Sequence, residues 1–208
     1  MVRLPAAAVF LAALCCSPLA AAQSAPQSAP QSAHLLGPEV PAGIAPRYLL
    51  MNPQGRAVSQ EDFRGRFQLV TFGFVSCPDV CPTTLLEFRH VLALLGERAA
   101  RLQAIFITVD PERDTPAVLR EYTAAFDARI LGLSGSAELV RRAADSFRVQ
   151  YEQVRETGAA PGQYTMNHTA GMYLLDGRGQ FLTKFAYAMP ATEIAARIGA
   201  AMTAAGMP

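Results

Sequence analysis

The sequence has no tryptophan and no excess of charge of either sign. Its 208 residues carry 18 Lys and Arg against 17 Asp and Glu, a formal net charge of +1. A chain so close to neutral has no strong attraction for polyanions, so we expect no nucleic acid among its partners. The 51% hydrophobic content is that of an ordinary globular protein.

The sequence also lacks a long hydrophobic run at its N-terminus. The first 22 residues combine Arg3, a short apolar region over residues 6–14 and three alanines at 20–22. This pattern is typical of an export signal, and the apolar region is short for a bilayer span. We therefore expect residues 1–22 to be cleaved and the protein to be periplasmic. The alternative is a retained anchor, or lipidation at Cys15 or Cys16, that holds the protein at the membrane facing the periplasm.

The segment that follows, residues 23–46, is rich in Pro, Ala, Ser and Gln. It repeats Gln-Ser-Ala-Pro almost three times and cannot bury a hydrophobic core. We interpret it as a tether and expect one folded domain over residues 47–208.

Cysteine is scarce, with four in the chain. Loss of residues 1–22 would leave Cys77 and Cys81, which are spaced C-x-x-x-C between an apolar run at 68–74 and a helical pattern of apolar residues from Leu85 to Leu95. The first turn of a helix favours thiolate over thiol. Two cysteines one turn apart have Cα atoms about 6 Å apart. That separation suits either a Cys77–Cys81 disulfide or two thiolates on one soft metal ion.

The pattern of apolar runs and turn signals predicts an α/β fold. A hairpin at 48–58 precedes a β-α-β unit, a second helix, a short strand, a further helix, an antiparallel hairpin and a C-terminal helix. This order fits a thioredoxin-like fold with an N-terminal β-hairpin extension and a helical insertion. The predicted elements are strands at 68–74, 102–109, 130–133, 149–154, 169–175 and 180–186, and helices after Cys81 and at 116–126, 136–147 and 190–205.

Two further residues are candidates for a site with the cysteines. Asp110 follows the second strand of the β-α-β unit, and functional crevices of open α/β sheets lie at the carboxyl ends of their strands. His168 is expected in a loop at the entrance to a central strand. Alone, Asp110 is also compatible with a turn before Pro111, and His168 with an ordinary structural histidine.

Three motifs together resemble the Sco/SenC family of copper-binding, thioredoxin-fold proteins that help to assemble the copper site of cytochrome c oxidase. The motifs are Gly73-Phe74-x-x-Cys77-Pro78-Asp79-Val80-Cys81-Pro82, Val109-Asp110-Pro111-Glu112-Arg113-Asp114-Thr115 and Asn167-His168-Thr169. The resemblance implies that Cys77, Cys81 and His168 bind copper and that Asp110 is an acidic neighbour supporting the site. It also implies that the protein receives copper from a periplasmic donor and passes it to an apo cytochrome c oxidase subunit. We expect the protein to be a monomer.

The donor set agrees with copper, since two thiolates and one imidazole suit Cu(I), and Cu(II) if a further ligand joins. The residues leave one alternative open. Cys77 and Cys81 could instead act as a redox pair that exchanges disulfides with a partner protein or a thiol reductant, without metal. The sequence alone does not decide whether the chain is an enzyme of that kind.

Overall fold

The computed structural model describes residues 43–155, 157–158, 160 and 163–206. The predicted signal segment and most of the predicted tether lie outside these residues, so the boundaries at 22 and 46 stay predictions. Among the described residues, no helix has the length and apolar character needed to cross a membrane.

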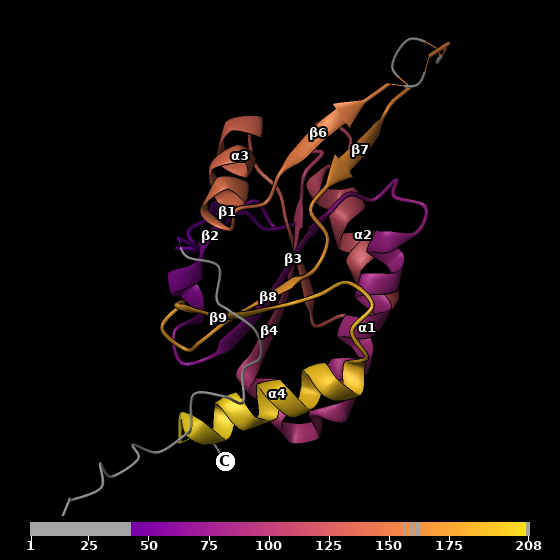
Figure 1. Ribbon diagram of the computed structural model, residues 1–208. Helices are drawn as coiled ribbons and strands as arrows, with labels where there is room; N and C mark the ends of the chain where they lie inside the picture. The colour runs from indigo at the N-terminus through magenta and orange to yellow at the C-terminus, as the bar shows by residue number, and fades with distance from the viewer. Residues whose placement is uncertain (1–42, 156, 159, 161–162, 207–208) are drawn as a thin grey trace, which may run out of the picture. The chain divides into compact units, whose positions relative to one another are not determined.

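A five-stranded mixed sheet forms the centre of the domain, with the order β5-β4-β3-β8-β9 (Figure 1). β3 pairs in parallel with β4, and β4 with β5, whereas β8 and β9 run antiparallel to their neighbours. Every residue of β3 and β4 is buried, as expected of central strands covered on both faces. The strands are β3 (Phe67–Gly73), β4 (Leu102–Thr108), β5 (Ile130–Leu133), β8 (Met172–Leu175) and β9 (Phe181–Phe185).

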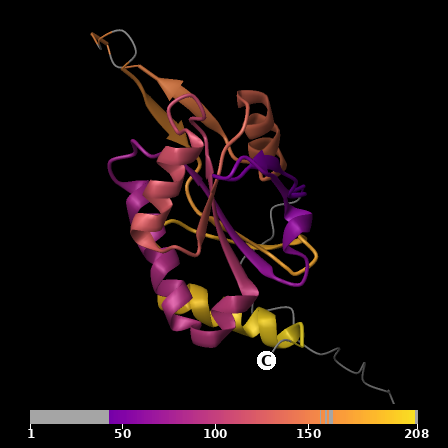
Figure 2. The same cartoon turned by 180° about the vertical axis from the view of Figure 1, so that it is seen from behind.

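Helices cover the two faces of this sheet. On one face α1 (Val80–Leu94) packs against α4 (Ala191–Ala204), and α2 (Pro116–Phe126) packs against β5. The other face is covered by α3 (Ala137–Ser146), beside the hairpin of β1 (Leu49–Met51) and β2 (Ala57–Ser59) (Figure 2). Two successive residues of β3 point to opposite faces of the sheet. Phe72 contacts Phe147 at the end of α3, whereas Gly73 faces α1.

Most predicted elements are present within one or two residues of their expected bounds. Ser59 and Asp62 form a capping box, which opens the 3₁₀ turn η2 (Gln60–Phe63). A second 3₁₀ turn, η3 (Gly96–Arg101), connects α1 to β4. Thr115 caps α2, with Pro116 in its first turn. These local signals fixed the elements because each one satisfies backbone groups that would otherwise lack a partner.

The strand predicted at 149–154 is present as β6 (Tyr151–Val154), but its partner β7 (Thr165–His168) was not predicted. The two strands form a ribbon that projects from the domain beside α3 (Figure 1). His168 is the last residue of β7 and pairs with Tyr151, so its expected position in a loop was wrong. The central strand β8 begins at Met172 rather than at 169. Gly171 separates the two strands with φ +121°, and a Cβ there would lie 2.7 Å from the Phe185 carbonyl oxygen. Only glycine fits this break.

Candidate metal centre

The two cysteines lie at the carboxyl end of β3, as predicted. Cys77 is in the loop before α1 and Cys81 is in the first turn of that helix. The Cys77 amide donates to the Phe74 carbonyl (3.3 Å), and the Cys81 amide donates to Cys77 Sγ (3.4 Å). Cys81 is 2% exposed, whereas Cys77 is partly exposed. Both are free thiols in this structure, so the Cys77–Cys81 disulfide stays a prediction for the oxidised protein.

The ribbon brings His168 to the cysteines from 87 residues further along the chain. His168 Nε2 lies 3.6 Å from Cys81 Sγ, and the ligand atoms of Cys77, Cys81 and His168 all lie within 4.8 Å of one another. No carboxylate or other imidazole in the described part of the chain joins this group. The three predicted ligands are therefore brought together, and Asp110 is not among them.

The second nitrogen of His168 fixes the state of the ring. Nδ1 lies 3.2 Å from the Thr169 carbonyl oxygen, which can only accept a hydrogen bond, so Nδ1 carries the proton and Nε2 keeps a lone pair. Burial also lowers the pKa of His168, which favours the neutral ring. A neutral imidazole with Nε2 directed at the cysteines is the form that binds a metal ion.

The environment of Cys81 differs from the expectation that a helix N-terminus favours thiolate. Burial raises the pKa of the Cys81 thiol, and its contact with Cys77 raises it further, although a hydrogen bond with the Phe74 backbone opposes the shift. Burial removes water from the charged form, and this cost exceeds the benefit of the helix end. A bound cation would have to displace this proton.

The geometry fits a small thiophilic metal ion. Metal bonds of about 2.0 Å to nitrogen and 2.3 Å to sulfur, at angles of about 109–120°, place the two ligand atoms about 3.5–3.7 Å apart. The observed separation of Cys81 Sγ and His168 Nε2 is 3.6 Å. Two thiolates and one imidazole suit copper, whereas a closed structural zinc site needs a fourth protein ligand, which this group lacks among the described side chains.

Asp110 lies close to the site but contacts none of the three ligands through a hydrogen bond. It is 3% exposed and accepts hydrogen bonds from Arg113 Nε and from the Tyr164 hydroxyl (2.8 Å). Its role as an acidic neighbour stays a prediction, and its side-chain contacts are with Arg113 and Tyr164. Tyr164 could not be predicted from the sequence, because a tyrosine in a polar loop is compatible with many positions.

Asp114, at the far end of the same motif, holds the cysteine loop directly. Its Oδ2 accepts from the Val75 amide (3.0 Å) and from the Thr108 hydroxyl (2.6 Å). Asp114 is 1% exposed, and burial raises its pKa. The cap of α2 is Thr115, so the Asp114 carboxylate is free to hold the cysteine loop.

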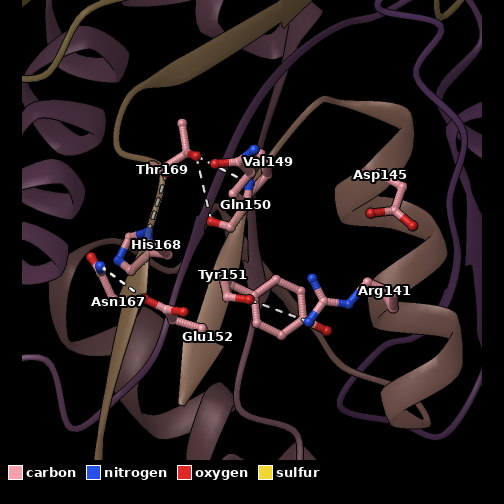
Figure 3. Close-up of a pocket in the computed structure, with 9 residues that line it drawn as sticks. All are labelled: Arg141, Asp145, Val149, Gln150, Tyr151, Glu152, Asn167, His168 and Thr169. Carbon is pink, nitrogen blue, oxygen red and sulfur yellow. Dashed lines mark hydrogen bonds between the residues drawn. The ribbon is translucent and has the colours of Figure 1, made fainter. Parts of the chain in front are cut away.

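A cavity of about 500 Å³ lies between α3 and the ribbon, beside His168 (Figure 3). α3 contributes Arg141 and Asp145. Arg141 stacks on the Tyr151 ring, with its Cζ 3.6 Å from the ring centroid. His168 thus lines this cavity and also lies next to Cys81. The lining residues are Arg141, Asp145, Val149, Gln150, Tyr151, Glu152, Asn167, His168 and Thr169.

Comparison with known proteins gives relatives that are named as SCO proteins. The chain is 35% identical to a SCO2-like protein of Rickettsia felis over 136 residues, which are 65% of this chain and 66% of that protein. It is 37% identical to the mitochondrial SCO2 homologue of Bos taurus over 153 residues, 71% of this chain and 55% of that protein. The aligned part thus spans about two thirds of the bacterial relative and about half of the bovine one.

Solved structures give the same result. ScoI of Bradyrhizobium japonicum with copper bound matches with a TM-score of 0.69 and 40% identity, over 75% of this chain and 98% of that chain. Yeast Sco1 with copper bound matches with a TM-score of 0.68 and 33% identity, over 76% of this chain and 87% of that chain. These matches confirm the predicted thioredoxin-like α/β fold. A sequence profile described as SCO1/SenC matches residues 38–203, and this chain belongs to the SCO1/SenC family.

Proposed function

We propose that this protein is a copper chaperone that binds one copper ion through Cys77, Cys81 and His168 and delivers it to the copper site of an apo cytochrome c oxidase subunit. The observation that carries the proposal is the convergence of two sulfur atoms and one imidazole nitrogen within 4.8 Å, from segments far apart in the sequence. The relatives from Bradyrhizobium japonicum and yeast were solved with copper bound, which supports the choice of metal.

Transfer by ligand exchange is the mechanism that this site supports best. Cys81 is buried, so an incoming ligand cannot reach it first, whereas Cys77 and His168 are partly exposed. The cavity beside His168 offers a place for a side chain of the recipient next to that ligand (Figure 3). A recipient thiolate or imidazole would then replace His168 before the cysteines release the ion.

The setting of this function is also a proposal. Residues 1–22 would direct export to the periplasm, or would stay as a membrane anchor facing it, and residues 23–46 would tether the domain. A periplasmic donor would supply copper to the reduced protein, because copper binding requires both thiols in their reduced state. The protein would act as a monomer.

Thiol–disulfide exchange is the second candidate, and the unequal exposure of the cysteines favours it. A partly exposed Cys77 could attack a partner disulfide, and the buried Cys81 could then resolve the mixed disulfide. This chemistry does not explain the position of His168, whose Nε2 is directed at Cys81. We therefore place copper binding first.

Substitution of His168 tests the proposal against this alternative. The reduced domain would be loaded with copper under anaerobic conditions, with a competing chelator, as wild type, His168→Ala and His90→Ala. His90 is an exposed residue of α1 outside the ligand group and serves as the matched control. Changes that only disturb the support of a ligand cost about 10–100-fold in metal affinity. We expect His168→Ala to lose more than this, while His90→Ala retains one copper per chain.

The same proteins would be titrated with a thiol–disulfide buffer. The copper proposal expects His168→Ala to form the Cys77–Cys81 disulfide as readily as wild type. Equal copper retention by His168→Ala and wild type would refute the three-ligand site. A wild-type protein that retains no copper but cycles its disulfide would establish the second candidate instead.

A further inference from the structure

A set of contacts outside the ligand group joins the loop after β4 to the beginning of β7. The loop contributes Asp110 and Arg113, and Tyr164 immediately precedes β7, the strand that ends at His168. Neither Arg113 nor Tyr164 approaches the cysteines through a hydrogen bond. Their contacts hold the start of β7 instead.

Three contacts fix Arg113 and Tyr164 to one another and to Asp110. Arg113 Nε donates to Asp110, Arg113 Nη1 donates to the Tyr164 carbonyl oxygen (3.0 Å), and the Tyr164 hydroxyl donates to Asp110 Oδ1 (2.8 Å). The guanidinium carbon also lies 3.8 Å from the centroid of the Tyr164 ring. A planar guanidinium can stack and donate two hydrogen bonds at once, which an ammonium group cannot do.

The same arginine faces the aromatic side chain that supports His168. Arg113 Cζ lies 5.9 Å from the Phe74 ring centroid, and the Phe74 ring meets the His168 ring edge-on at 6.0 Å. Phe74 is 2% exposed and cannot move aside easily. The Arg113 and His168 side chains thus both contact the Phe74 ring.

The ribbon needs such an anchor because its strands pair only with each other among the described strands. An isolated two-stranded hairpin is marginally stable in water. At the His168 end, the Thr169 amide donates to the Gln150 carbonyl oxygen (2.9 Å) and the Gln150 amide donates to the Thr169 hydroxyl (3.0 Å), which extends the pairing of the two strands. At this end Arg141 of α3 also donates to the Tyr151 carbonyl oxygen (3.2 Å). At the other end, before Thr165, the Arg113 and Asp110 contacts with Tyr164 hold β7 to the domain.

We propose that Arg113 and Tyr164 are positioning residues for His168: by holding the start of β7, they keep His168 Nε2 next to Cys81. The proposal rests on the copper site proposed above and adds the residues that preorganise it.

Two mild substitutions test this inference. Arg113→Lys keeps the charge but loses the stack and the second hydrogen bond, and Tyr164→Phe keeps the ring but loses the hydroxyl contact with Asp110. Arg142→Lys is the matched control, because Arg142 pairs with Glu138 on the exposed surface of α3. Amide hydrogen exchange in the reduced, metal-free protein would be followed separately for β7 and for the core strands β3 and β4.

We expect both variants to exchange the amides of β7 at least about tenfold faster than wild type while β3 and β4 keep their protection. Copper retention against a chelator should fall about 10–100-fold, the range for residues that support a metal ligand. Arg142→Lys should match wild type in both measurements.

Two results would overturn the inference. One is unchanged exchange in β7 for Arg113→Lys and Tyr164→Phe. The other is an equal loss of protection in β7 and in the core strands, which would make the contacts a general support of the fold. The exchange measurement needs no copper, so a wild-type protein that failed to bind copper would refute the proposed function and leave this test intact.

Discussion

Replacement of Gly73 by alanine should damage the metal centre from inside the sheet. Gly73 is the last residue of β3 and its α-carbon faces the first turn of α1. A Cβ added there would lie 2.7 Å from Cys81 Sγ and 2.8 Å from Phe106 Cε2. Non-bonded heavy atoms pack best at about 3.5–4.0 Å, so both neighbours, or the backbone at residue 73, must shift by about 1 Å.

Neither neighbour has room to move. Cys81 is 2% exposed and Phe106 is fully buried. Forcing a methyl group into a packed core costs about 1–3 kcal/mol, and the alanine recovers about 0.4–1 kcal/mol by restricting the unfolded chain. We expect a net loss of about 1–2 kcal/mol in the free energy of unfolding. Metal sites tolerate displacements of only about 0.2 Å, so copper affinity should fall about 10–100-fold.

The assay separates damage to the site from damage to the fold. Urea unfolding would give the stability of each protein, and a chelator competition would give the copper affinity of the reduced form. Gly132→Ala in β5 is the matched control, because its Cβ would meet Leu119 Cβ at 3.1 Å, on α2 and away from the cysteines. The control should lose some stability and bind copper as wild type does.

The reasoning would be refuted if Gly73→Ala bound copper as tightly as Gly132→Ala. Cys81 would then have room to shift without loss of the ligand geometry. A Gly73→Ala protein as stable as wild type would also refute the packing argument, because it would show that Phe106 and Cys81 relax without cost.

Two further predictions concern Tyr122 and the pH dependence of stability. The Tyr122 hydroxyl is buried with no hydrogen-bond partner among the described residues, so Tyr122→Phe should raise the free energy of unfolding by about 1 kcal/mol in a urea titration. A loss of stability would mean that the hydroxyl has a partner. Burial lowers the pKa of His168 below its ordinary 6.5, so the unfolded chain takes up this proton first as the pH falls. The stability contributed by neutral His168 is thus present above pH 6.5 and decreases below it, by at most about 1.4 kcal/mol at pH 5.5. The change in unfolding free energy between pH 7.5 and 5.5 should therefore be smaller for His168→Ala than for wild type. An equal change in the two proteins would contradict the assignment.

The central sheet could be predicted from the sequence because its signals are local. The buried strands β3 and β4 read as continuous apolar runs, and the helices carry their own caps and apolar faces. In the ribbon, β6 had a strand signal but β7 had none. Thr165 to His168 are polar or partly buried residues, and they form a strand only because Tyr151 to Val154 lie opposite them. Tertiary pairing of this kind cannot be seen in one segment alone.

The ligands could be named from the sequence, but their environment could not. The spacing of Cys77 and Cys81 indicated a shared site. His168 was a candidate from its place before a central strand, and the resemblance to Sco/SenC proteins implied that it is a ligand. Whether a thiol at a helix end is a thiolate depends on burial, and for Cys81 burial raises the pKa. Asp110 and Asp114 lie four residues apart in one loop, and their different contacts follow from side-chain directions that the sequence does not contain.

Gly73 shows why the fold and the site have to be considered together. In the sequence it is one glycine at the end of a strand. In the structure it gives the space in which Cys81 Sγ lies against the sheet beside Phe106. The thiol is buried because the strand carries no side chain at this position, and its burial is what raises its pKa and withholds it from incoming ligands. A larger residue at 73 would therefore change both the burial of Cys81 and the position of its sulfur. The difference in copper affinity between Gly73→Ala and Gly132→Ala measures the combined effect of these two changes.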